Sequence, residues 1–281
     1  MLAAAWAGPR AVAVGAHGIV LLSDDQGKSW RQAGKVPADV TLTGVSFATE
    51  KEGWAVGHAG VVLHTVDGGE RWELQRSAPD QDRPLFAVHF FDASRGVAVG
   101  LWSLVLTTGD GGRHWTERQL PSPPGARRAD LNLFGLFAGP GGALYAAAEK
   151  GYVLHTDDQG ASWNYLATGY RGSFWTGAAL ADGALLVGGL RGALYRSADA
   201  GQHWSRIDTG TTASITGMAR TGSDGGVLAV GQDGLTLRSE DGVAFRASYR
   251  HDRLPLNALL PNAGFTPPLM SAMGPAPADA K

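Results

Sequence analysis

The chain has 281 residues, of which 41 are glycine and none is cysteine, and its formal net charge is −2. The lack of cysteine excludes disulfides and cysteine-ligated zinc sites, and the near-neutral charge argues against a protein that binds nucleic acid through bulk electrostatics. Hydrophobic residues make up 44% of the chain, enough for a large core, so an extensively disordered protein is excluded.

The N-terminal segment, Met1 to Trp6, has neither a basic region nor a long apolar stretch. We therefore expect no complete signal peptide in this sequence, and we expect further residues before Met1 in the natural protein. No run of about 18 apolar residues occurs, so the sequence predicts a protein that does not span a membrane. Abundant glycine between many short apolar runs predicts a single all-β body.

One pattern, Ser/Thr-x-Asp-x-Gly-x-x-Trp, recurs along the chain. Five complete copies and a shorter sixth copy, which ends in Phe245, contain the aspartates Asp25, Asp67, Asp110, Asp158, Asp199 and Asp241. The complete copies end in Trp30, Trp72, Trp115, Trp163 and Trp204. Successive aspartates are 42, 43, 48, 41 and 42 residues apart, which is the period of a four-stranded β-propeller blade.

Each repeat divides into four short strands separated by turn residues. In the second repeat the apolar and β-branched runs predict strands at residues 42–47, 54–57, 61–65 and 72–75. The aspartate can accept hydrogen bonds from N–H groups of its own turn, and the glycine supplies a positive φ. The tryptophan begins the outer strand and carries a large apolar surface that can seal one blade against the next. We therefore interpret these motif residues as structural.

The first strand of each repeat has a small residue at its third position, as expected where inner strands crowd around an axis. These residues are Ala4, Gly44, Ala87, Gly135, Gly177, Gly217 and Ala258. Seven inner strands predict a β-propeller of the seven-bladed type, with six complete blades and an incomplete seventh within residues 1–260. Residues 261–281 contain five prolines, which remove ladder donors, and are expected to form a tail. A six-bladed ring with a surplus C-terminal strand is the alternative.

The repeated motif is the Asp-box, or bacterial neuraminidase repeat (BNR). Its framing by Gly53-Trp54-Ala55-Val56-Gly57 and by Leu63 to Gly69 recurs at residues 96–100 and 108–112. With this framing, residues 2–260 resemble the photosystem II assembly/stability factor family of seven-bladed propellers. The resemblance implies a non-catalytic, periplasmic or otherwise extracytoplasmic accessory factor without a cofactor. Its partner would be another protein, such as a subunit of a membrane complex.

Strand alternation places the turns between second and third strands on the same side as the connections between blades. Binding residues often lie on such loops, and Arg, Trp and Tyr are favoured at protein interfaces. The candidate partner-binding residues on that side are Arg83, Trp102, Arg127, Arg128, Tyr170, Arg171, Arg191 and Arg253. The longest connection, residues 120–130, contains two of these arginines and is the first candidate.

A sialidase-like glycoside hydrolase is the alternative function, because Asp-boxes are common in that class. Its Phe/Tyr-Arg-Ile-Pro motif does not occur in the sequence, and Asp130 and Glu149 are the best candidates for a pair of catalytic carboxylates. No histidine pair has metal-ligand spacing on one element, so no metal site is expected. The sequence thus favours a protein that is not an enzyme.

Overall fold

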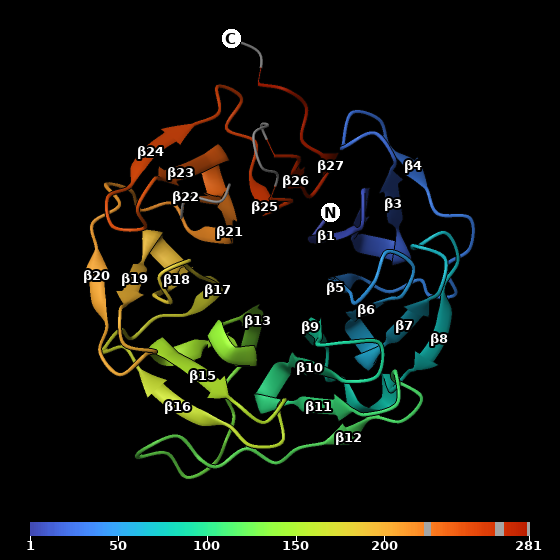
Figure 1. Cartoon of the computed structure of the whole chain (residues 1–281), viewed down its shortest axis with the longest axis horizontal. Helices are drawn as coiled ribbons and strands as arrows, with labels where there is room; N and C mark the ends of the chain where they lie inside the picture. The colour runs from blue at the N-terminus through green and yellow to red at the C-terminus, as the bar shows by residue number, and fades with distance from the viewer. Residues whose placement is uncertain (222–225, 262–266, 280–281) are drawn as a thin grey trace. The chain divides into compact units, whose positions relative to one another are not determined.

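The computed structural model describes residues 1–221, 226–261 and 267–279. Within these residues the strands form six four-stranded antiparallel sheets and one three-stranded sheet, each made of consecutive strands (Figure 1). This arrangement confirms the seven-bladed propeller with an incomplete last blade. The contacts divide the chain into two compact units, residues 1–133 with 156–163, and residues 134–155 with 164–281.

The first unit contains three complete blades, and their inner strands β1, β5 and β9 lie side by side (Figure 1). The strands are β1 (Ala3–Ala7), β2 (Arg10–Val14), β3 (Val20–Ser23), β4 (Arg31–Gln32), β5 (Leu42–Phe47), β6 (Gly53–Gly57), β7 (Val62–Thr65), β8 (Glu73–Arg76), β9 (Leu85–Phe90), β10 (Gly96–Gly100), β11 (Val105–Thr108) and β12 (Thr116–Glu117). The unit also includes the Asp-box of the fourth blade, residues 156–163.

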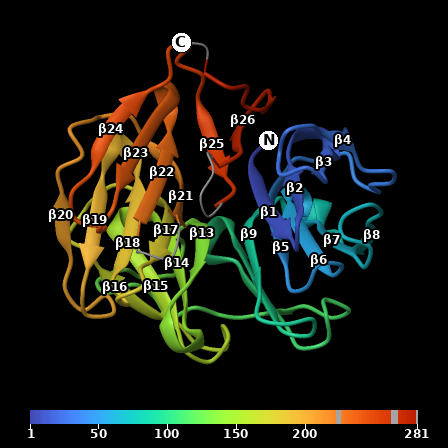
Figure 2. The same ribbon diagram turned by 45° about the horizontal axis from the view of Figure 1, so that its top comes forward.

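The second unit contains the rest of the fourth blade and the last three blades, again with neighbouring inner strands (Figure 2). Its strands are β13 (Leu133–Ala138), whose first residue belongs to the first unit, β14 (Leu144–Ala148), β15 (Tyr152–Thr156), β16 (Asn164–Ala167), β17 (Phe174–Ala179), β18 (Leu185–Gly189), β19 (Leu194–Ser197), β20 (Ser205–Ile207), β21 (Ile215–Thr221), β22 (Gly226–Gly231), β23 (Leu235–Ser239), β24 (Arg246–Tyr249), β25 (Leu256–Leu259), β26 (Leu269–Ser271) and β27 (Gly274–Pro275).

The helices of the described residues are eight three-residue 3-10 turns, and none is long and apolar enough to cross a membrane. They are η1 (Ala16–Gly18), η2 (His58–Gly60), η3 (Pro79–Gln81), η4 (Leu101–Ser103), η5 (Pro140–Gly142), η6 (Glu149–Gly151), η7 (Leu190–Gly192) and η8 (Gln232–Gly234). Six of them, all but η3 and η5, connect the second strand of a blade to its third.

The C-terminal segment differs from the expected proline-rich tail, because it contributes β26 and β27 to the last blade. Pro275 lies in β27, which pairs only with β26, so its missing N–H leaves no ladder bond unmade. The adjoining Ala276 N–H still donates to the Leu269 carbonyl oxygen at 2.7 Å. The prolines of the segment therefore do not exclude strands from it, and the described residues of this blade form three strands.

Small residues allow the inner strands of neighbouring blades to approach closely. A Cβ atom added to Gly135 would lie 2.5 Å from the carbonyl oxygen of Trp175 in the next inner strand. One added to Gly44 would lie 3.0 Å from the Cα atom of Ala87. The apolar cores are shared between adjacent blades; the core of the first two contains Val12 and Leu22 with Trp72, which is 1% exposed.

The six Asp-boxes fold into the same hydrogen-bonded turn. In every copy the Ser or Thr hydroxyl donates to the aspartate Oδ1 and accepts from the glycine N–H, at 2.7–3.0 Å. In the five complete copies the N–H before the tryptophan donates to the same Oδ1 at 2.9 Å. The outer strand begins one residue after each tryptophan. Four of the five tryptophans donate Nε1–H to the box glycine carbonyl, whereas the buried Nε1 of Trp115 has no partner among the described residues.

The donors around Asp110 and Asp199 favour the ionised form of these two box carboxylates. The backbone N–H and the ring of His114 lower the pKa of Asp110 from 3.8 to about 2. His203 does the same for Asp199 through its backbone N–H and its ring, which lies 2.7 Å from Oδ2. The folded state therefore binds these protons more weakly than the unfolded chain, so ionisation of the carboxylates favours the folded turn.

We expect Gly135→Ala to lower the free energy of unfolding by about 1–3 kcal/mol, because the new methyl group must displace the Trp175 carbonyl. Gly109→Ala is the matched control, since no atom lies within 4 Å of the Cβ position there; its effect should stay below about 0.5 kcal/mol. Urea unfolding measures both. Equal effects of the two substitutions would show that the inner strands do not require this close approach.

We expect Asp199→Asn to lower the melting temperature most above about pH 4, where the wild-type carboxylate is ionised in both the folded and the unfolded state. The folded-state pKa is depressed, so the advantage of the wild type should shrink as the pH falls from about 4 towards about 2. Thermal unfolding of both proteins across this range measures the difference. A difference independent of pH would contradict a role for the ionised carboxylate.

Candidate partner-binding site

In each complete blade the turn between the second and third strands is hydrogen-bonded to the connection that leads to the next blade. We call this the connection end of a blade, and the opposite end, with the Asp-box, the box end. The bonds join Gly18 to Val40, Ala78 to Ala59, Ser103 to Leu131, Gly151 to Gly172, Thr209 to Gly192 and Arg250 to Gly234, at 2.7–3.0 Å. The turns and connections thus lie together, as strand alternation predicts.

The turn at the connection end has a left-handed backbone at two successive residues in all six complete blades. The first residue is never glycine and has φ between 52° and 58°. The second residue is glycine in five blades, and in the third blade it is Ser103, with φ 57°. A non-glycine residue in this region is strained, and a bulky one such as Trp102 (φ 52°) is a marked outlier. The third blade therefore has the most strained turn of the six.

Hydrogen bonds to the longest connection hold the strained turn of the third blade. The Ser103 N–H donates to the Leu131 carbonyl at 2.7 Å, and the Ser103 Oγ accepts from the Leu131 N–H at 3.0 Å. The Trp102 N–H donates to Oδ1 of Asn132 at 3.1 Å. These bonds fix the end of the connection beside Trp102, whose side chain is 56% exposed. The result is an exposed aromatic side chain on a rigid backbone.

The predicted arginines of the first unit differ in how they are paired. Arg127 and Arg128 lie exposed on the connection that is anchored to Trp102, and Arg128 reaches Asp130 only at 4.0 Å. Arg83 is half-buried and donates to Glu117 of the outer strand β12 at 3.0 Å. The exposed pair therefore supplies positive charge on the connection whose end is bonded to the Trp102 turn, whereas the charge of Arg83 is compensated.

The predicted residues of the second unit form no comparable cluster among the described contacts. Tyr170 is half-buried, donates its hydroxyl to the Leu190 carbonyl at 3.0 Å and packs against Phe174. Burial raises its pKa. Arg171 and Arg191 are exposed, and Arg253 lies 4.5 Å above the ring of Tyr249. The Tyr170 side chain thus has a packing role.

The two carboxylates of the glycoside hydrolase alternative lie in different units, Asp130 beside Arg128 and Glu149 at the start of η6. Within residues 1–221, 226–261 and 267–279, no group of three or more His, Asp or Glu side chains is placed to hold a metal ion.

Sequence reasoning missed Ser103 and Asn132, which position Trp102. Alignment of the repeats contains a signal for Ser103, because five blades have glycine at this turn position. Asn132 has no such signal, since its bond to the Trp102 N–H joins residues 30 positions apart, across two strands and a connection whose length is unique in the chain.

The fold and this end define a β-propeller that presents an aromatic and basic surface on loops of a rigid scaffold. The chain belongs to the family described as photosynthesis system II assembly factor YCF48, which matches residues 5–80 and 76–240. Comparison with functionally curated proteins gives no match.

Solved structures share the fold over nearly the whole chain. The structure described as YCF48 bound to D1 peptide has a TM-score of 0.76 and 19% identity, covering 97% of this chain and 90% of that chain. YCF48 from Cyanidioschyzon merolae has a TM-score of 0.75 and 17% identity, covering 98% and 93%. The β-propeller domain of Cps50 (Swd1) from Myceliophteria thermophila has a TM-score of 0.70 and 12% identity, covering 95% and 91%. None of these three is described as a glycoside hydrolase, so they give that alternative no support.

We expect Ser103→Ala to destabilise the protein by about 1–2 kcal/mol, because the left-handed strain remains while the bond to Leu131 is lost. Ser103→Gly loses the same bond but relieves the strain, so its effect should be smaller by about 1 kcal/mol. Urea unfolding compares the two. Hydrogen exchange should be faster at residues 118–132 in both variants, and unchanged exchange there would contradict the anchoring role of Ser103.

Proposed function

We propose that this protein is a non-catalytic accessory factor that acts outside the cytoplasm and binds a segment of a membrane-complex subunit. The binding site is the connection end of the third blade, with Trp102 as the aromatic anchor and Arg127 and Arg128 as the charged groups. The observation that carries the proposal is the exposed Trp102 side chain on a strained turn that three hydrogen bonds hold in place.

The geometry suits recognition of a flexible polypeptide segment. Large aromatic side chains on a fixed backbone lose little entropy on binding, and strained residues persist where the surrounding structure over-determines them. The exposed guanidinium groups of Arg127 and Arg128 favour a segment that carries carboxylates. The anchor and the charges thus select an acidic segment with an apolar or aromatic side chain.

The family supports the class of partner. The chain belongs to a family of photosystem II assembly factors, and a related propeller has been described bound to D1 peptide. The extracytoplasmic location and the absence of catalysis are proposed from the resemblance to that family. The bound segment would belong to a subunit awaiting assembly, which this protein holds without chemical change.

A photo-crosslinking residue at position 102 tests the proposal in the native host. We expect crosslinks to one subunit of a membrane complex. We expect none from the same residue at position 66, because Val66 is 65% exposed but lies within an Asp-box, at the box end. Charge reversal in an Arg127→Glu, Arg128→Glu variant should reduce the crosslinked product about tenfold or more without changing the melting temperature. Equal crosslinking from both positions, or insensitivity to the charge reversal, would contradict this site.

A further inference from the structure

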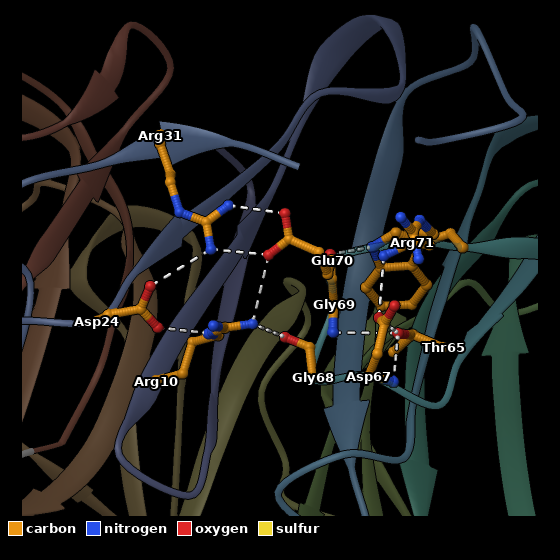
Figure 3. A network of polar contacts seen from close by, with 10 residues as sticks. Arg10, Asp24, Arg31, Thr65, Asp67, Gly68, Gly69, Glu70 and Arg71 are labelled. Atoms are coloured by element: carbon orange, nitrogen blue, oxygen red, sulfur yellow. Dashed lines mark hydrogen bonds and ion pairs between the residues drawn. The ribbon is translucent and has the colours of Figure 1, made fainter. Parts of the chain in front are cut away.

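An ion-pair network joins the box ends of the first and second blades (Figure 3). Arg31 makes two bonds to the Glu70 carboxylate, at 2.7 and 2.8 Å, and a third to Asp24 at 3.3 Å. Arg10 binds Asp24 at 2.5 Å and lies 3.6 Å from Glu70. The guanidinium groups lower the pKa of both carboxyls. The box-end junction of two adjacent blades can thus accommodate two arginines paired with two carboxylates.

At the equivalent position, between the third blade and the Asp-box of the fourth, one of the two arginines is present, and the other arginine and both carboxylates are replaced. In the register of the strands, Ala11 pairs with Ser23 as Gly96 pairs with Thr108, so Arg95 stands where Arg10 does. By the same register and by the box motif, Gly109 replaces Asp24, Thr116 replaces Arg31 and Ala161 replaces Glu70. Both carboxylates of the network are therefore absent.

A surface pocket of about 330 Å³ lies where these smaller residues replace the network side chains. Its lining belongs entirely to the first unit: Arg95, Thr107, Thr108, Gly109, Asp110, His114, Thr116, Arg118, Asp158, Gln159 and Ala161. The four positions derived from the network, Arg95, Gly109, Thr116 and Ala161, are all part of this lining. The pocket therefore lies at the position that the ion-pair network occupies between the first two blades.

The carboxylates of the lining are already engaged in their own turns. Asp110 binds the N–H and the ring of His114, and Asp158 binds the N–H and the hydroxyl of Ser162, all at 2.6–2.9 Å. Arg118 is exposed and donates Nε–H to the Thr107 hydroxyl at 2.9 Å. No ion pair joins Arg118 to a carboxylate of the described residues.

Arg95 adds a second guanidinium to the pocket, and its pairing with Asp92 at 2.6 Å leaves its side chain half exposed. Thr107 and Thr116 also line the pocket.

We propose that this pocket binds a carboxylate, with Arg118 and Arg95 taking the places that Arg31 and Arg10 have around Glu70. A carboxylate accepts charge-assisted hydrogen bonds from guanidinium groups in this way. The site lies at the box end of the third blade, is distinct from the connection end of the proposed function and does not depend on that proposal. Two sources fit the chemistry: a free organic acid, or an acidic side chain of a polypeptide.

Calorimetric titration with glutarate, and with its uncharged diamide glutaramide, tests the charge requirement on the full-length protein. We expect glutarate to bind and glutaramide to show no binding. Arg118→Gln should weaken glutarate binding about tenfold or more. Arg113→Gln, which removes an exposed arginine of the same blade outside the lining, should leave it unchanged. Equal binding of acid and diamide, or equal effects of the two substitutions, would overturn the proposal.

Rebuilding the network offers a second, independent test. In a Thr116→Arg, Ala161→Glu variant the new carboxylate should pair with the new arginine and abolish glutarate binding, while the melting temperature stays the same or rises. A folded variant that still binds glutarate with wild-type affinity would overturn the assignment of the pocket. The source of the carboxylate follows from wild-type titrations with the peptide acetyl-Gly-Glu-Gly-amide: tighter binding than glutarate identifies a polypeptide side chain, and weaker binding a free acid.

Discussion

Within each of the two units, adjacent blades of this propeller bury their apolar residues in shared cores. That burial requires a close approach of the inner-strand backbones. At Gly135, for example, a single methyl group would clash with the Trp175 carbonyl. The Asp-box serves the same requirement at the outer edge, because it closes the turn that delivers Trp72 into the core shared by the first two blades. Both devices recur in each complete blade because each junction between blades poses the same packing problem.

This recurrence explains how much of the fold the sequence predicts. A residue that serves every blade appears at a fixed period, so the boxes, the small inner residues and four strands per repeat could all be read from spacing. The strands β26 and β27 could not, because they belong to an atypical blade that has three strands among the described residues and no Asp-box. A proline that would disrupt a central strand is compatible with that edge, as Pro275 shows.

The candidate partner site was predictable only in part, for a related reason. Strand alternation places Trp102 and the exposed Arg127 and Arg128 at one end of a blade without any knowledge of side-chain contacts. The anchoring bonds from Ser103 and Asn132 bridge about 30 residues across a connection that occurs once in the chain, so no repeat reveals them. Exposure is equally hidden from sequence: Tyr170 lies on a blade connection but its ring packs against Phe174 and its hydroxyl is bonded.

In a protein built from repeats, each regular blade serves as an internal reference for the others. The third blade departs at both ends. Ser103 replaces glycine at a turn whose left-handed backbone strains a non-glycine residue, and its hydroxyl makes a bond to Leu131 that glycine could not make. At the other end, Gly109 and Thr116 occupy the positions of Asp24 and Arg31 of the first blade. A pocket lined by Arg95 and Arg118 lies there. At the box end, Trp115 also lacks the Nε1 bond that the other box tryptophans make. Ser103 and the Nε1 of Trp115, which has no partner among the described residues, are thus two departures from the repeat pattern in one blade, and the sites proposed at its two ends would both take carboxylates.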